Sequence, residues 1–317
     1  MVPDYAAEFE LIARAYEQSG GDPAGLIDKR FASLVVSHNR ILHSNSIPGV
    51  RIEGEETPTG ARARITVEPG TLVVHPVHLC FGVLPKEGLQ EIISDFQVGE
   101  GAKVGFVAHC SFPNAVHVKH VMQATIRVDR GGQMEYSETH YHGPDGGVEV
   151  LPVAHIEVNE GGLYRSWFKL IQGTVGTLRL DYQAHLKKDA VCELDARVYG
   201  KKRDRISINE SLFLDGENSR GLAKSRVVAA DDCVSEVVGE AVGNAPNARG
   251  HVDCVEILKG PNARASAVPK LTVVNDRAKL THEAAIGSVD KKQVETLMAR
   301  GLSEEQAVDV VVRGMLR

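Results

Sequence analysis

The sequence predicts a mainly β protein in which short strands repeat along most of the chain between two helical ends. Apolar and polar residues alternate in residues 62–68, 178–181 and 193–198. This alternation places one face of a strand in a core and the other face in water. Turn-forming pairs also recur between Gly101 and Asn244, at steps of 26 to 30 residues. Such spacing is typical of stacked solenoid coils, although a β-sandwich, whose turns also recur, remains an alternative.

The first 50 residues have the apolar spacing of helices. Tyr5, Phe9, Ile12 and Tyr16 recur three or four positions apart. Two glycines at positions 20 and 21 end this run, and a second short helix is expected after residue 23. The glycines and prolines of residues 47–60 predict a linker. We therefore predict a helical N-terminal region over residues 1–55 and a β core over residues 56–287.

The C-terminal residues 288–317 return to a helical pattern. Val294 and Leu297 share one face of a first helix, and Gly301 is suited to end it. Ser303, with a glutamine three positions later, predicts a capping box at the start of a second helix. The apolar face of this helical hairpin is longer than the hairpin itself can cover. It is therefore expected to pack on the β core or on another protein.

Composition and motifs exclude several classes of protein. The chain has 317 residues and a formal net charge of -6, which argues against a broad electrostatic interaction with nucleic acid. No stretch approaches the roughly 20 apolar residues of a membrane span. Residues 1–5 lack the pattern of a secretory signal, so we expect a cytoplasmic protein. The P-loop pattern is missing, so this chain is not expected to hold ATP in such a loop.

The cysteines are widely spaced, and no two of them form a CxxC pair. A disulfide framework, a zinc ribbon and a ferredoxin-type loop are therefore not expected. Any metal site must combine distant parts of the chain. The five cysteines are Cys80, Cys110, Cys192, Cys233 and Cys254.

Histidines are numerous, with thirteen in the chain. His140 and His142 share a face if they lie on a strand, and His109 directly precedes Cys110. A surface rich in histidine and cysteine suits a transition metal or sulfur chemistry. Most single histidines are nevertheless expected to be surface residues without a ligand role.

Cys254, His282 and Glu283 offer a mixed set of ligands for iron. A thiolate, an imidazole and a carboxylate together form a reasonable iron site. His282 and Glu283 are adjacent, so on a regular strand they point to opposite faces. Both would reach one site only at a bend or at an interface between two chains. For Cys254 alone, inert packing in a core is the alternative.

Four ordered segments resemble the SufB/SufD family of iron–sulfur cluster assembly scaffolds. Residues 247–254, 278–287 and 300–307 are similar to three late motifs of that family, and residues 107–113 to an earlier cysteine-containing segment. The resemblance implies a right-handed parallel β-helix with a helical C-terminal segment. It further implies a non-catalytic scaffold of the SUF system that docks a SufC-like ABC-type ATPase. A cysteine desulfurase system would supply the sulfur.

The resemblance also implies roles for single residues. Cys254 matches the scaffold cysteine of SufB, Glu283 matches a SufB glutamate linked to cluster formation, and His282 matches a histidine that SufD contributes. Cys110 matches a cysteine proposed as the entry point of sulfur, although residues 139–142 differ from the SufB segment that continues this route. One chain thus carries both halves of the site, which implies a homodimer or a pair with a SufB/SufD paralogue. The cluster would be transient, of the 4Fe–4S or 2Fe–2S type.

Cys233 has no counterpart in this resemblance. It precedes Cys254 by about one short coil, and stacked strands lie roughly 4.8 Å apart. We therefore expect Cys233 to stack near Cys254 and to ligate the same iron centre. A cysteine that only fills the core is the alternative.

Two enzyme functions remain as alternatives to a scaffold. A β-helix enzyme acting on polysaccharide would use paired carboxylates such as Glu193 and Asp195. Aromatic residues that could line its subsites are scarce, with Trp167 as the single tryptophan. A cupin-like metalloenzyme would use four histidines, and either enzyme would act without an ATPase. The four are His75, His78, His140 and His142.

Overall fold

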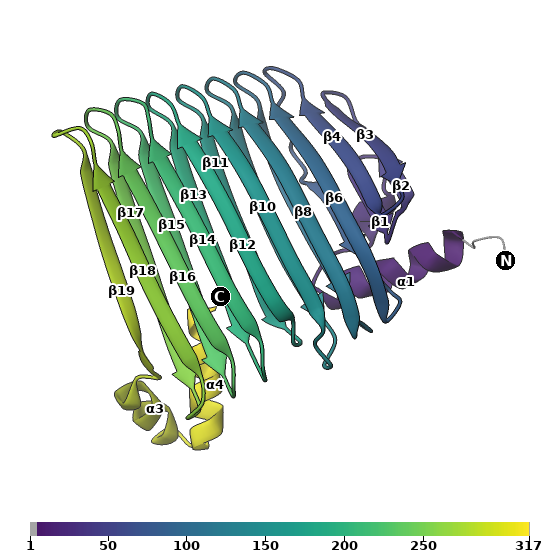
Figure 1. The fold of residues 1–317 in the computed structure, drawn as a ribbon. Coiled ribbons are helices and arrows are strands. Elements are labelled where there is room, and N and C mark those ends of the chain that lie inside the picture. The colour runs from purple at the N-terminus through teal and green to yellow at the C-terminus, as the bar shows by residue number, and fades with distance from the viewer. Residues whose placement is uncertain (1–4, 317) are drawn as a thin grey trace.

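The computed structural model describes residues 5–316, which form a long parallel β-helix with helices at both ends (Figure 1). From β5 onward, successive strands alternate between two facing sheets. The ten-stranded sheet contains β1 (Ser33–Ser37), β2 (Arg40–Asn45), β5 (Val77–Gly82), β7 (Lys103–Phe112), β9 (Gln133–His142), β11 (Leu163–Gln172), β13 (Val191–Gly200), β15 (Arg220–Ala230), β17 (Arg249–Lys259) and β19 (Lys279–Ser288). The nine-stranded sheet contains β3 (Val50–Thr57), β4 (Gly60–Val67), β6 (Glu87–Val98), β8 (His117–Val128), β10 (Val148–Val158), β12 (Gly176–Leu186), β14 (Arg205–Leu214), β16 (Val234–Gly243) and β18 (Arg264–Val273).

The strands within each sheet pair in parallel and in close register. Leu163 pairs with Val191, Val191 with Arg220, and Arg220 with Arg249. One coil therefore spans 28 or 29 residues at these positions, which accounts for the turn spacing in the sequence. Among the described strands, β1–β2 and β3–β4 are the antiparallel pairs. The predicted solenoid is confirmed, and the β-sandwich alternative is wrong.

In each of six successive coils, the same turn contains one residue in the left-handed backbone conformation. These residues are Gly101, Gly131, Gly161, Asp189, Asn218 and Asn247, with φ between 55° and 66°. Glycine, asparagine and aspartate adopt this conformation with the least strain. Asn218 also donates a hydrogen bond to Asp189 at 3.0 Å, and Asn247 donates to Asn218 at 3.3 Å. The side chains of this turn therefore form a ladder along the β-helix.

The inward faces of the strands form a continuous apolar core. In β13, Leu194, Ala196 and Val198 are fully buried. The outward residues Asp195 and Arg197 of the same strand form an ion pair at 2.9 Å. The alternation in the sequence therefore predicted the inward and outward faces of this strand correctly.

The N-terminal region contains more strand than predicted. Helices α1 (Tyr5–Gln18) and α2 (Ala24–Ile27) match the prediction, but β1, β2 and β3 begin before residue 55. The predicted linker at residues 47–60 is wrong, because it contains β3 and the turn to β4. In β1, Leu34 faces the β core while Val35 packs with Ile12 and Tyr16 of α1. A strand buried on both faces has no alternation, so its pattern did not separate it from a helix.

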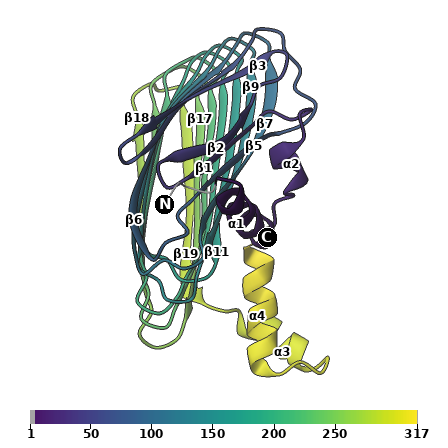
Figure 2. The same ribbon diagram turned by 90° about the vertical axis from the view of Figure 1, so that its right-hand side faces the viewer.

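The C-terminal residues form the predicted helical hairpin of α3 (Lys291–Met298) and α4 (Glu304–Met315). The capping box of Ser303 and Gln306 is present, with both reciprocal hydrogen bonds. Val312 is buried against Val228 of β15, so the hairpin packs on the outer face of the ten-stranded sheet. Figure 2 shows α1 and α4 on this same side of the β-helix. None of the helices within residues 5–316 is long and apolar enough to cross a membrane.

Leu194→Ala should lower the free energy of unfolding by about 2–5 kcal/mol, because it leaves a cavity in a core that the neighbouring coils hold in place. Urea unfolding followed by circular dichroism measures this change. Val274→Ala is the matched control, since Val274 is 67% exposed. Equal unfolding midpoints for the two variants would contradict the burial of Leu194.

Candidate functional site

Cys254 lies on the inner face of β17, one strand from the open end of the ten-stranded sheet. β19 and β18 are the last strands of their sheets, so each has an edge without a neighbouring strand among the described residues. Cys254 pairs with Ser225 on one side and with Ala284 on the other, and is 4% exposed. Burial, with a smaller effect of Glu256, raises the pKa of Cys254 to about 12. In the single chain this cysteine is therefore a protonated thiol.

His282 and Glu283 point to opposite faces of β19, as the sequence predicted. His282 pairs with Val252, an inward residue like Cys254. Glu283 pairs with Asp253, whose side chain is on the outer face. Both His282 and Glu283 are exposed, because within residues 5–316 no further coil covers β19. Within one chain, His282 thus shares the face of Cys254, and Glu283 does not.

Cys233 lies in the turn before β16. It is away from the column of inward residues, one from each coil, that contains Cys254. A hydrogen bond from Ser235 to Glu256 shows which residues of β16 and β17 oppose each other across the core. β16 and β17 run in opposite directions, so the position of β17 that faces Cys233 across the core lies about four residues from Cys254. Along the strand, this separation is roughly 13 Å. Cys233 is instead fully buried beside Gly200. The predicted stacking of the two cysteines is wrong, because a full coil is longer than the segment between them.

Two carboxylates near Cys254 were not predicted from the sequence. Glu210 of β14 and Glu256 of β17 are both buried. Glu210 accepts a hydrogen bond at 3.2 Å from Ser225, the neighbour of Cys254 in the sheet. Burial raises the pKa of Glu210 to about 8 and that of Glu256 to about 7. The core beside Cys254 can therefore take up and release protons near neutral pH.

The signal that could have identified these carboxylates is a break in the alternation. In β14, Ile206, Ile208 and Leu212 occupy inward positions, and Glu210 occupies the inward position between the last two. Glu256 follows Cys254 in the inward series of β17 in the same way. Because a buried acid is costly, its presence in an apolar series indicates a functional or paired group.

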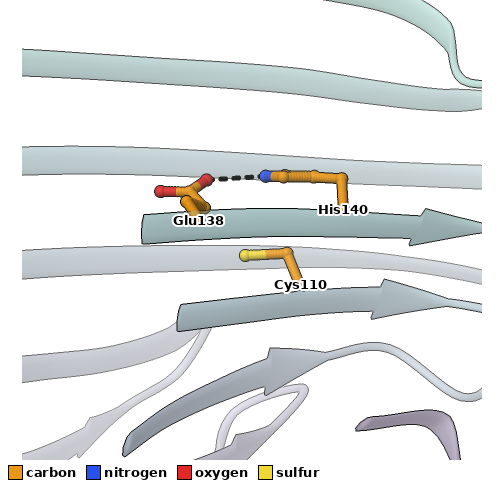
Figure 3. Close-up of side chains that lie close together, drawn as sticks. All are labelled: Cys110, Glu138 and His140. Carbon is orange, nitrogen blue, oxygen red and sulfur yellow. Dashed lines mark hydrogen bonds and ion pairs between the residues drawn. The ribbon is translucent and has the colours of Figure 1, made fainter. Parts of the chain in front are cut away.

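A second polar cluster lies inside the β-helix, around Cys110. Cys110 of β7 pairs with His140 of β9, and Glu138 occupies the preceding inward position of β9. All three residues are buried, and their ligand atoms lie within 4.8 Å of one another. Glu138 and His140 form a hydrogen bond of 2.6 Å between Oε1 and Nε2 (Figure 3). The sequence had indicated the histidine and the cysteine, but not Glu138.

Three of the residues named for the two enzyme alternatives form other contacts. Glu193 forms an ion pair with Arg165 at 2.9 Å, and Asp195 is paired with its own neighbour in β13. His78 contacts the hydroxyl of Tyr16 in α1 at 2.8 Å. The parallel β-helix is also not a cupin fold, so the cupin-like alternative is wrong in its architecture.

The fold and site define a parallel β-helix protein with a cysteine buried beneath an open sheet end. Residues 88–315 match the family model described as SUF system FeS cluster assembly, SufBD core domain. The chain is 38% identical over 309 residues to the iron–sulfur cluster assembly SufBD family protein MJ0034 of Methanocaldococcus jannaschii. This match covers 98% of each chain. It is also 37% identical over 313 residues to the SufBD family protein PH0883 of Pyrococcus horikoshii, covering 99% of this chain and 95% of that protein.

A shorter match joins the chain to the iron–sulfur cluster assembly protein SufB of Bacillus subtilis. It is 32% identical over 72 residues, or 23% of this chain and 16% of that protein. The extent of the family match and of the two long matches settles membership. The chain belongs to the SufBD family of the SUF system, which takes part in iron–sulfur cluster assembly.

Glu210→Gln should reduce the loss of stability between about pH 5 and about pH 8. Since burial raises the pKa of Glu210 from 4.5 to about 8, the folded chain retains a proton that the unfolded chain releases. The stability that this proton provides is complete below the unfolded pKa and is lost as the pH rises toward the folded pKa. Glutamine does not titrate, so the difference between the urea midpoints at the two pH values should shrink.

The control for this measurement is Glu193→Gln, which changes a partly exposed carboxylate of the outer face. The difference between the two variants isolates the effect of the buried position of Glu210. An unaltered pH dependence in Glu210→Gln would show that this carboxyl is ionised in the folded chain.

Proposed function

We propose that the chain is a scaffold subunit of a SUF-type iron–sulfur cluster assembly complex and that a nascent cluster forms where two chains meet at the open end. The observation that carries this proposal is the position of Cys254, buried one strand from that end on the same face as the exposed His282. Membership in the SufBD family supports it. The chain would act as a cytoplasmic scaffold without catalysis of its own, and ATP would be hydrolysed by a partner.

The exposed edge of β19 is suited to pairing with a second copy of the chain. An open edge presents unpaired N–H and C=O groups that bind another strand. β18 is less suited, because Pro269 lies in it and cannot donate a hydrogen bond. Ile286 of β19 is 44% exposed and would be covered by such a contact. Two-fold pairing would join the same edge of each copy, and a SufB/SufD paralogue with a similar edge is the alternative partner.

The residues at this interface would supply a mixed set of ligands. Cys254 and His282 of each copy would face the shared interior, with Glu283 at its rim. Iron would displace the proton of Cys254, and Glu256, two positions along the same face, is suited to accept it. Thiolate, imidazole and carboxylate bind a cluster less tightly than four thiolates. This suits a transient 4Fe–4S or 2Fe–2S cluster that is passed on. Cys233 is not part of this proposed set.

The C-terminal hairpin is the proposed docking site for a SufC-like ABC-type ATPase. A groove of about 1050 Å³ separates α3 and α4 from the last strands of the ten-stranded sheet. Its apolar lining includes Val255, Ile257, Ile286, Leu297, Val310 and Met315. Lys259 of β17 holds Asp309 of α4 at 2.9 Å. A movement of the docked ATPase would therefore be transmitted through these contacts to β17 and β19, which carry the proposed ligands. Sulfur would come from a cysteine desulfurase system.

Cys254→Ala should abolish cluster assembly. The purified chain would be incubated anaerobically with iron and sulfide, with and without the ATPase, and followed by visible absorbance and electron paramagnetic resonance. The wild-type chain should form a labile cluster, because its thiols can bind iron once the proton is displaced. Cys192→Ala removes a buried cysteine of β13, remote from the open end, and should retain the cluster. A full cluster in Cys254→Ala would overturn the assignment.

Ile286→Lys should convert a dimer of the chain into a monomer, because it places a charge on the proposed pairing strand. Light scattering after size exclusion measures the mass of each species. Val310→Lys is the control: it lines the same groove but lies on α4, so the dimer should persist. A monomeric wild-type chain would contradict homodimer formation and direct the search to a paralogue.

A further inference from the structure

The polar cluster around Cys110 is separate from the proposed assembly site. β9, which carries Glu138 and His140, is separated from β17 by β11, β13 and β15 in the same sheet. At about 4.8 Å per strand, the cluster lies roughly 19 Å from the column of Cys254. Its groups therefore need an explanation of their own.

This part of the core contains more polar groups than its hydrogen bonds satisfy. Among residues 5–316, both ring nitrogens of His120 and Nδ1 of His142 are buried without a hydrogen-bond partner. The His120 and His140 ring centroids are 6.2 Å apart, and those of His140 and His142 are 5.7 Å apart. Unpaired buried polar atoms are uncommon, because each costs free energy comparable to a lost hydrogen bond. The arrangement therefore indicates that this section of the core is built around a partner other than the described side chains.

We propose that Cys110, Glu138 and His140 bind one divalent transition-metal ion, such as Zn²⁺ or Fe²⁺, inside the β-helix. Figure 3 shows the three side chains on neighbouring strands, with Glu138 and His140 joined by their hydrogen bond. Ligand atoms bound tetrahedrally to zinc are roughly 3.3–3.8 Å apart, given bonds of about 2.0–2.3 Å. The atoms of this cluster lie within 4.8 Å of one another, so small side-chain rotations would bring them to that geometry.

The charges of the three ligands match a divalent ion. A thiolate and a carboxylate together neutralise a charge of two, which removes the cost of a bare ion in a core. Burial raises the pKa of the Cys110 thiol well above its usual value, so the metal would have to displace that proton. Thiolate, imidazole and carboxylate ligands together favour zinc and iron over magnesium or calcium.

Neighbouring side chains contact the proposed ligands His140 and Cys110. The other ring nitrogen of His140, Nδ1, lies 3.5 Å from Nε2 of His142, which would fix the orientation of the ligating ring. The sulfur of Met122 lies 4.0 Å from Sγ of Cys110. A small cavity of about 30 Å³ borders Glu138 and Met122.

The metal role and the sulfur-entry role are alternatives for Cys110. A cysteine that receives sulfur must reach an external donor with a free thiolate. Cys110 is fully buried, and a metal-bound thiolate would not be free. The proposed ion would instead stabilise the polar section of the core, and the proposal does not depend on cluster assembly at the open end.

Cobalt is the probe for this site, because a Co²⁺–thiolate bond gives a charge-transfer absorption that zinc lacks. The full-length chain would be produced in medium with added cobalt, since buried ligands exchange slowly, and analysed for metal content. One Co²⁺ per chain with a thiolate charge-transfer band is expected. Cys110→Ser should remove the band, and Glu138→Gln and His140→Gln should each lower the retained cobalt at least tenfold.

Two variants test whether the signal comes from this cluster. Cys192→Ser changes another fully buried cysteine and should keep the band, as should Cys254→Ala. A wild-type chain without a thiolate band would overturn the proposal. So would a band that persists in Cys110→Ser or disappears in Cys254→Ala. The measurement needs no added sulfide or ATPase, so a failure of cluster assembly would not affect this result.

The melting temperature provides a second measurement if Cys110→Ser does not fold. The wild-type chain produced in medium with added Zn²⁺ should melt several degrees above the same chain produced without it, because the ion binds the folded state alone. Glu138→Gln, which keeps the shape of the side chain, should lose most of this increase. An equal increase in the wild type and in Glu138→Gln would place the metal elsewhere.

Discussion

The parallel register of the β-helix is the constraint on which the rest of the structure depends. It places every inward residue beside the residue one coil away, so like side chains form columns through the core. In an apolar column each side chain is buried against the next, which stabilises the fold, as for Leu194 and its neighbours. A polar residue gains only if the neighbouring coil supplies a partner. Cys110 beside His140 and Ser225 beside Cys254 meet this condition, so the register itself assembles the polar sections.

These polar sections differ in how their charges are balanced. Near Cys254, Glu210 and Glu256 each accept a hydrogen bond from a serine, and burial raises their pKa values toward neutral pH. This arrangement allows protons to be exchanged when a buried thiol loses its own. Around Cys110, both ring nitrogens of His120 and Nδ1 of His142 have no hydrogen-bond partner, and the thiol, carboxylate and imidazoles together are a set suited to metal binding. The same core thus offers two kinds of chemistry in different coils.

The sequence predicted the features that depend on local pattern. Alternation and turn spacing gave the solenoid, and the capping box gave the last helix. Most of the errors came from information that the pattern of a single strand does not contain. β1 lacks alternation because α1 covers its second face. Cys233 was misplaced because the length of a coil follows from register, and Glu138 and Glu210 were overlooked because their inward direction becomes certain only when the neighbouring strands are known.

The two ends of the β-helix are protected unequally, and this asymmetry bears on association. At the N-terminal end, β3 forms an antiparallel hairpin with β4 and exposes Arg51, Glu53 and Glu55, charges that discourage further pairing. α1 also covers the outer face of β1 and β5 there. At the C-terminal end β19 exposes a regular edge with apolar residues such as Ile286. The proposed pairing with a second chain would therefore take place at the end beside Cys254.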